Sequence, residues 1–306
     1  MKSLIASLHD YINVRKSLGY KLTEQERYLK SFVKFLKKKN CQYVTVKLAT
    51  EWATLPRDAK LATWSQRLSI VRLFARYRIA SDPRTEVPPP YLLSQQPNRV
   101  TPYIYSEQEI QKLLKACQLL PSKGLRCHTY FTFFGLIAVT GCRINELISL
   151  NRNDFDEKNG WIIIRNSKCD KSRLLPLHQT TIQQLKKYAK IRDRFPVQDG
   201  NAFFLSDRGM RITEWSTRYV FIQISKKIGL RNMIDSHGPR IHDIRHRFAI
   251  LTLLNWYHEG ADINKKIILL STYLGHKKPT DTYWYVTGTP ELLAQATAKL
   301  EKNIGE

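Results

Sequence analysis

Apolar residues in the first 80 positions recur at the spacing of an α-helix. In the stretch after Thr23, one side of such a helix collects Leu29, Phe32, Val33 and Leu36. Thr23 and Glu26, three residues apart, predict a capping box at its start. The same pattern predicts helices over residues 2–18, 44–54 and 60–80. We therefore expect a helical first domain over residues 1–81.

Proline interrupts this pattern over residues 82–104. The stretch contains Pro83, the run 88–90, Pro97 and Pro102. Proline fixes φ and removes a backbone donor, so these residues predict a semi-rigid, extended linker. We place the domain boundary here, with a second domain over residues 105–306.

The second domain is predicted to be mostly helical. Ser106 and Glu109 form another capping box, and residues 129–139 are apolar all round, which is typical of a buried helix that Gly141 ends. Two strands are expected at 161–165 and 173–177, joined by the polar turn 166–172, with a third strand or a turn at 203–205. Further helices are expected over 143–150, 180–192, 213–228, 242–257, 263–273 and 289–302. The predicted fold class is mainly α with a small antiparallel β-sheet.

Charge points to a polyanionic partner. The chain of 306 residues carries a formal net charge of +24, which favours nucleic acid over a merely solvated basic surface. Residues 1–99 hold 19 Lys and Arg against 7 Asp and Glu, a net +12 and half of the excess. The 60–80 helix carries Arg67, Arg72, Arg76 and Arg78 opposite its apolar stripe, which we interpret as a clamp on phosphates.

Membrane, metal and cofactor sites are not predicted. The longest apolar run, residues 130–140, has about half of the ~20 residues that a membrane span needs. The five cysteines form no CxxC pair, which fits a reduced, cytoplasmic compartment. His242 and His246 are four residues apart but lack a third ligand at metal spacing, so we interpret His246 as a core histidine.

A series of polar residues suits phosphate chemistry, although each has an ordinary alternative. Arg143 follows a Thr-Gly break, where it can face an anion or simply pair with Glu146. Lys168 sits in the predicted hairpin turn, where it can donate a proton or merely be solvated. His242 and Arg245 share a helix face. His276 follows Gly275, and nine residues later comes the phenol of Tyr285, which needs nearby positive charge or a base to act as a nucleophile.

The joint order of these groups resembles the tyrosine recombinases, the family of phage integrases and Xer-type resolvases. The matching stretches are 140–150, 167–177, 241–249 and 274–285. The first 81 residues look like the core-binding domain of that family, so the resemblance covers nearly the whole chain. The ending around residues 281–292 resembles a transposon-borne subgroup.

The resemblance implies a role for each residue. Arg143 and Arg245 would hold the scissile phosphate, His276 would hydrogen-bond it, and Glu146 would orient these groups. Lys168 would be the general acid, although Ser167-Lys168-Cys169 stands where the family has Gly-Lys-Gly, so Lys171 stays an alternative. His242 would serve in proton transfer. Tyr285, chosen over Tyr283 by its spacing from Leu274-Gly275-His276, would attack and form the 3′-phosphotyrosine bond.

The predicted function is therefore site-specific breaking and rejoining of double-stranded DNA, for integration, excision or transposition. Two alternatives remain from the sequence: a type IB topoisomerase, and a DNA-binding protein without catalysis. By the same resemblance, a tail helix over 290–303 would dock on a neighbouring subunit of a homo- or hetero-tetramer on two DNA sites.

Overall fold

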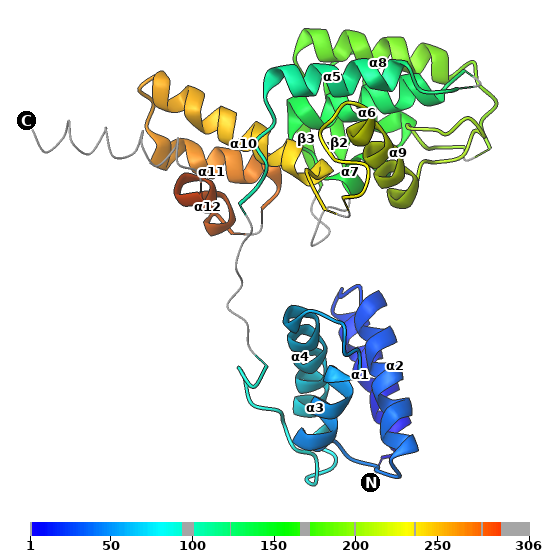
Figure 1. The fold of residues 1–306 in the computed structure, drawn as a ribbon, viewed down its shortest axis with the longest axis vertical. Helices are drawn as coiled ribbons and strands as arrows, with labels where there is room; N and C mark the ends of the chain where they lie inside the picture. The colour runs from blue at the N-terminus through cyan, green and yellow to red at the C-terminus, as the bar shows by residue number, and fades with distance from the viewer. Residues whose placement is uncertain are drawn as a thin grey trace, which may run out of the picture. The chain divides into compact units, whose positions relative to one another are not determined.

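A computed structural model of the chain describes residues 2–93, 101–122, 124–165, 172–198, 200–235, 237–276 and 278–288. The chain divides into two units, residues 1–100 and 101–306 (Figure 1). Each unit has a core of its own. The predicted tail helix lies outside the described residues, as do all residues but the last of the hairpin turn predicted at 166–172.

Four helices build the first unit: α1 (Leu4–Ser17), α2 (Thr23–Lys38), α3 (Val46–Thr54) and α4 (Leu61–Arg78). The predicted apolar stripe of α2 is confirmed, since all four of its residues are buried. The predicted capping box at its start is wrong. Thr23 is the first helical residue, and the N-cap position belongs to Leu22, which has no side-chain cap. Leu22 is instead buried, so packing fixes this helix start.

The arginines of α4 mostly stabilise the fold, which corrects their interpretation as a phosphate clamp. Arg78 is 1% exposed and bonds to Asp82 at 3.1 Å and to the Ser7 hydroxyl at 2.6 Å. Arg67 donates to the Trp52 carbonyl at 2.6 Å and stacks over its ring. Arg78 follows the buried Phe74 by four residues, so it lies on the buried side of α4 and not opposite to it.

The first part of the predicted linker packs on this unit. Arg72 donates to the carbonyls of Pro88 and Pro89 at 2.8 Å each, and Glu86 accepts from the backbone of Val46 at 2.7 Å. Val87 and Leu93 pack against the helical core. Proline kept this stretch out of regular structure, yet its carbonyls remain good acceptors for a helix arginine.

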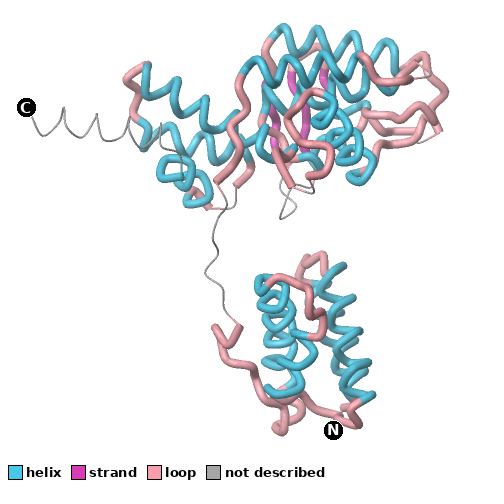
Figure 2. Tube along the Cα trace, in the orientation of Figure 1, coloured by secondary structure: helices cyan, strands magenta, loops and turns pink. Residues whose placement is uncertain are grey.

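The second unit begins with helices α5 (Glu107–Gln118), α6 (Arg126–Thr140) and α7 (Ile144–Ile148). A three-stranded antiparallel sheet follows in the order β1 (Phe155–Asp156), β2 (Trp161–Ile164) and β3 (Arg173–Pro176). Then come α8 (Gln179–Arg192) and α9 (Glu214–Lys227). Figure 2 shows the small sheet among these helices, which confirms the predicted fold class.

Local signals decide several of these boundaries. The capping box of α5 is confirmed, with Glu109 N–H donating to the Ser106 hydroxyl at 3.1 Å and Ser106 N–H donating to the Glu109 carboxylate at 2.7 Å. The third strand is β1, and residues 203–205 form no strand. Ala202 and Leu205 make only isolated bridges. Phe203 and Phe204 are fully buried there, so their apolar character reports burial and not strand pairing.

As far as residue 288, where the described part ends, the second unit continues with three helices: α10 (Ile241–His258), α11 (Ile263–Leu274) and α12 (Thr280–Gly288). They pack together around a separate apolar cluster that includes Ile250, Leu253, Ile267 and Leu274 (Figure 1). Helix α12 was not expected from the sequence, which has a Thr-rich, aromatic run there. Within the described residues, no helix has the length and apolar character that crossing a membrane requires.

Candidate active site

Arg143 is positioned by the sharp corner between α6 and α7. Gly141 ends α6 with φ of 61°, in the left-handed region that favours glycine. A Cβ at this position would lie 2.6 Å from Phe248 Cδ1 and 3.1 Å from Leu274 Cδ2, so only glycine lets α10 and α11 approach. The corner leaves Arg143 at the N-cap of α7, with its backbone N–H donating to Glu146 at 3.0 Å.

Two guanidiniums meet at the end of α11. Arg245, on α10, donates to the Gly141 carbonyl at 2.5 Å and to the Leu274 carbonyl at 2.8 Å. Arg143 donates to the same Leu274 carbonyl at 3.3 Å and to the Gly275 carbonyl at 2.9 Å. Two cations that share one acceptor lie close together, although their positions in the chain are about a hundred residues apart.

Glu146 holds this arrangement together. Its carboxylate accepts from Arg143 Nη1 at 2.8 Å and from both terminal nitrogens of Arg173 at 3.0 and 2.8 Å. Arg173 in turn donates from Nε to the Tyr273 carbonyl at 2.9 Å. Glu146 therefore links the α6–α7 corner, strand β3 and the end of α11. Burial alone would raise the pKa of Glu146, but its bonds to Arg173 and Arg143 lower it to about 2.

Helix α12 brings the phenol of Tyr285 to the same place. Gly275 ends α11 with φ of 66°, and the next residue, His276, donates to or accepts from the Thr282 hydroxyl at 2.7 Å. Tyr285 is one turn beyond Thr282 and is 2% exposed, and its ring stacks at 6.3 Å from that of His276. Tyr283, on the same helix, is 41% exposed.

The two histidines of α10 lie face to edge. The rings of His242 and His246 are 4.5 Å apart at 83°. Nδ1 of His246 lies 2.9 Å from the hydroxyl oxygen of Tyr285. The side chain of His242 is exposed, whereas that of His246 is partly buried. Among the described hydrogen bonds, the phenol of Tyr285 is therefore in contact with His246 and not with His242.

The electrostatics of the site favour an anion. Burial, together with the charges of neighbouring cations, lowers the pKa of His246 to about 3 and of His276 to about 4, so both rings are neutral at pH 7. Burial and the Arg143 charge also lower the pKa of Arg245 to about 10, which still leaves it a cation. The site therefore has a net charge of +2, from three guanidiniums (Arg143, Arg173 and Arg245) and one carboxylate (Glu146).

The structure brings together most of the residues singled out in the sequence. Arg143, Glu146, His242, Arg245, His276 and Tyr285 all line this region, while Lys168 and Lys171 lie outside the described residues. Sequence reasoning missed two residues. His246 was interpreted as a core residue, although it shares a helix face with His242. Arg173 is expected from the sequence only as the first residue of a strand, although the strand alternation puts it on the same face as the buried Leu175.

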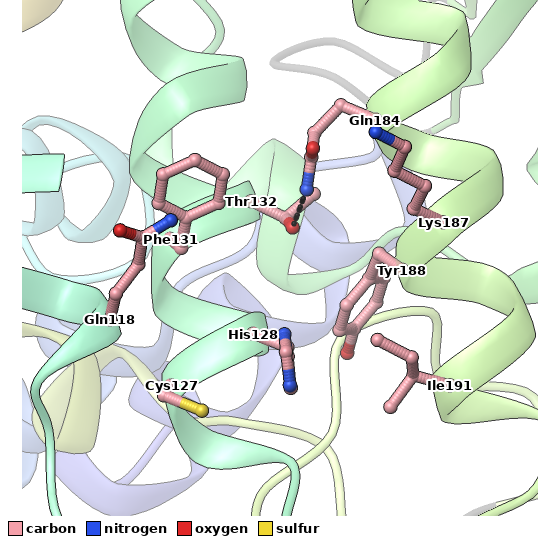
Figure 3. A pocket seen from close by; sticks show the side chains of 9 residues that line it. All are labelled: Gln118, Cys127, His128, Phe131, Thr132, Gln184, Lys187, Tyr188 and Ile191. Atoms are coloured by element: carbon pink, nitrogen blue, oxygen red, sulfur yellow. Dashed lines mark hydrogen bonds between the residues drawn. The ribbon is translucent and has the colours of Figure 1, made fainter. Parts of the chain in front are cut away.

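A separate cavity of about 390 Å³ lies between α6 and α8. Figure 3 shows the Thr132 hydroxyl and the Gln184 amide joined across it, at 3.3 Å. None of the residues discussed above lines this cavity, and Lys187 is the one residue with a fixed charge in its lining. It lacks the paired cations of a phosphate site. No group of three metal-binding side chains is found in the described part of the chain.

Acid should destabilise the second unit in two overlapping pH windows. His246 and His276 have folded-state pKa values below the ordinary 6.5, so between about pH 6.5 and 3 the unfolded chain binds protons that the folded chain does not. Stability is then lost as pH falls, on the order of a few kcal/mol. The lowered pKa of Glu146 adds a second loss, between about pH 4.5 and 2. Calorimetry from pH 8 to 3 checks this, and a constant Tm between pH 6.5 and 4 would contradict it.

Comparison with known proteins identifies related chains. Residues 104–291 match the model of the phage integrase family. The protein named "Putative integrase/recombinase y4rB" of Sinorhizobium fredii is 41% identical over 308 aligned residues, which cover 99% of this chain and 98% of that one.

Solved structures with the same fold are more distant in sequence. The Tn1549 transposon integrase in complex with transposon right end DNA has a TM-score of 0.69 at 17% identity, covering 98% of this chain and 99% of the other. A lambda integrase tetramer bound to a Holliday junction has a TM-score of 0.61 at 19% identity, covering 92% and 79%. At this identity the likeness concerns the fold.

Proposed function

Because the chain belongs to the phage integrase family and is a tyrosine-type DNA breaking and rejoining enzyme, we propose that Tyr285 is its nucleophile. The hydroxyl of Tyr285 attacks a phosphodiester in double-stranded DNA and forms a 3′-phosphotyrosine bond. The phosphotyrosine keeps the energy of the broken linkage, so a DNA hydroxyl can reverse the reaction on another strand. This is the chemistry of site-specific recombination.

The observation that carries the proposal is the excess of fixed positive charge beside a buried phenol. In-line attack on a phosphodiester, which carries one negative charge, builds up to two on the non-bridging oxygens. The site carries a net charge of +2, from Arg143, Arg173, Arg245 and Glu146. This charge stabilises the doubly negative transition state more than the singly negative ground state, which is the condition for catalysis. Bonds to backbone carbonyls hold these guanidiniums before substrate arrives.

Each of the other groups then takes a role. Arg143 and Arg245 bind the scissile phosphate, and His276, held by Thr282, donates a hydrogen bond to it. For that bond, the neutral His276 ring must carry its proton on Nε2. Nδ1 then accepts a hydrogen bond from the Thr282 hydroxyl. Glu146 orients the two arginines. Lys168 protonates the leaving 5′-oxygen, and His242 takes part in moving protons at the edge of the site.

Assembly and surroundings extend the proposal. The first unit clamps duplex DNA through exposed lysines of α2, namely Lys34, Lys37 and Lys38, since three of the four α4 arginines are engaged within the fold. The lambda integrase relative is a tetramer on a Holliday junction, which supports a tetramer here, joined through the tail over 290–303. Four described cysteines are free, which suits a cytoplasmic enzyme.

A trapping experiment tests the proposed nucleophile. The full-length protein is incubated with a nicked duplex taken from the DNA that flanks its gene, so that the cut piece diffuses away and religation stops. We expect a covalent protein–DNA adduct, and after digestion the nucleotide should be found on the peptide that contains Tyr285. Attachment to another residue would contradict the proposal. Relaxation of plasmids without sequence preference or strand exchange would instead favour the topoisomerase alternative.

A further inference from the structure

The hydrogen bond between α10 and α12 points to a residue that takes the proton from the nucleophile. Nδ1 of His246 lies 2.9 Å from the hydroxyl oxygen of Tyr285. We propose that His246 accepts the proton of the Tyr285 hydroxyl as that oxygen attacks the phosphate. This inference rests on the proposed role of Tyr285 and adds a catalytic residue to it.

The geometry suits a general base. A base must lie within about 2.6–3.2 Å of the atom that loses the proton, and His246 meets this distance. Its ring is held on two sides, edge-on against His242 at 4.5 Å and against Trp284 at 5.7 Å. A ring fixed in this way keeps one nitrogen aimed at the phenol, which reduces the cost of reaching the reactive arrangement.

His246 is neutral before the reaction, as a group that accepts a proton must be. Burial first, and then the positive charge of its surroundings, lowers its pKa to about 3. The charged or titratable groups that act on it are Arg240, His242 and Arg245 on its own helix, His276 after α11, and Tyr285 on α12. At pH 7 the ring is therefore neutral, and with its proton on Nε2 the Nδ1 lone pair can accept.

Substrate should strengthen this base. Two of the groups that depress its basicity, Arg245 and Arg240, are cations whose field a bound phosphodiester opposes. The negative charge of the phosphate therefore raises the affinity of His246 for a proton. Before DNA arrives the base is too weak to ionise Tyr285, so the phenol keeps its proton until a phosphate is in place.

The proposed step balances in protons and electrons. The O–H bond of Tyr285 breaks, and its proton forms a new N–H bond at Nδ1 of His246, which becomes an imidazolium. The phenolic oxygen bonds to phosphorus. The P–O5′ bond breaks, and its electron pair leaves with the 5′-oxygen, which takes a proton from the general acid. Religation returns the proton from His246 to Tyr285. His242, exposed and packed on His246, is placed to exchange that proton with solvent.

The first test compares His246→Asn with the wild-type protein in single-turnover cleavage of the nicked flanking duplex. The amide oxygen of asparagine can accept the hydrogen bond of Tyr285 but cannot take its proton in this pH range. A general base contributes about 10²- to 10⁴-fold, so we expect at least a roughly 100-fold loss at pH 7. Between pH 6 and 9.5 the variant should gain rate with rising pH, as more phenolate forms, where the wild-type rate is flat.

The second test separates proton removal from proton donation. In a duplex whose scissile 5′-oxygen is replaced by sulfur, the leaving thiolate needs no general acid. Lys168→Ala should then regain cleavage, whereas His246→Asn should stay impaired. Equal recovery of both variants on the sulfur-substituted duplex would overturn the proposal and leave His246 a positioning residue. A His246→Asn cleavage rate within about threefold of wild type at pH 7 on the ordinary duplex would do the same.

Two controls separate a loss of the proton acceptor from misfolding and from a wrong choice of nucleophile. Circular dichroism and duplex binding establish that His246→Asn is folded, and His246→Gln provides a second variant if it is not. Tyr285→Phe is run in parallel on both duplexes. An adduct in that variant would refute the proposed nucleophile, whereas no adduct there together with unimpaired His246→Asn refutes only the proton acceptor.

Discussion

Replacing Tyr285 with phenylalanine should abolish the covalent protein–DNA adduct while duplex binding changes by less than about threefold. The substitution removes the attacking oxygen and leaves the ring, which is 2% exposed, to fill the same space. It also removes the hydrogen bond to His246, at a cost of about 1 kcal/mol in the free energy of unfolding. Gel electrophoresis under denaturing conditions detects the adduct, and a mobility shift measures binding.

Tyr283→Phe is the matched control for this prediction. Tyr283 lies on the same helix but is 41% exposed, so removal of its hydroxyl should leave adduct formation at the wild-type rate. If Tyr283→Phe lost the adduct and Tyr285→Phe retained it, the choice between the two tyrosines would be reversed. Loss in both would indicate that α12 as a whole is sensitive to substitution.

Replacing Arg245 with lysine should lower the single-turnover cleavage rate by about 10³-fold or more. Lysine keeps the charge but not the planar group that reaches both the Gly141 and the Leu274 carbonyl. Losing a preorganised donor to developing negative charge costs about 10²- to 10³-fold, and a displaced cation adds to the loss. Loss of the donor to the buried Gly141 carbonyl should also lower the free energy of unfolding by about 1–3 kcal/mol, whereas the Leu274 carbonyl keeps its bond from Arg143.

Arg192→Lys separates the two effects of that substitution. Arg192 is another buried arginine of the second unit, and it donates from two nitrogens to the Ala202 carbonyl. We expect a comparable loss of stability, seen as a lower Tm, but cleavage near the wild-type rate at a temperature where the protein is folded. Equal cleavage losses in both variants would mean that Arg245 acts through the fold alone.

The site shows why a residue's chemical type is easier to predict than its contacts. Arg143 was expected either to bind an anion or to pair with Glu146, and in the structure it does pair with Glu146, at 2.8 Å. Glu146 is shared with Arg173, so pairing does not cancel the positive charge of the site. The two expectations were thus not exclusive, because a carboxylate can bind two guanidiniums at once.

Burial on α4 was the feature that the sequence misrepresented most. The sequence predicts Arg67, Arg72 and Arg78 on a basic side of the helix, which is typical of a solvated or DNA-facing surface. Arg78 instead follows the buried Val71 and Phe74 by seven and four residues, so it lies on the core side. A different segment binds each of these arginines: the Trp52 carbonyl, the prolines after position 87, and the residues around Asp82. The periodicity of one helix contains no information on which neighbouring segment packs against it.

The sequence by itself determined the helical character of the chain, the small antiparallel sheet and the order of the reactive groups. These depend on periodicity, on caps such as Ser106 with Glu109, and on glycine at positions 141 and 275, all of which act over a few residues. Tertiary structure alone decided that His246 contacts Tyr285 and that Arg173 shares Glu146. Such contacts join segments 27 to 39 residues apart, and only packing brings those segments together.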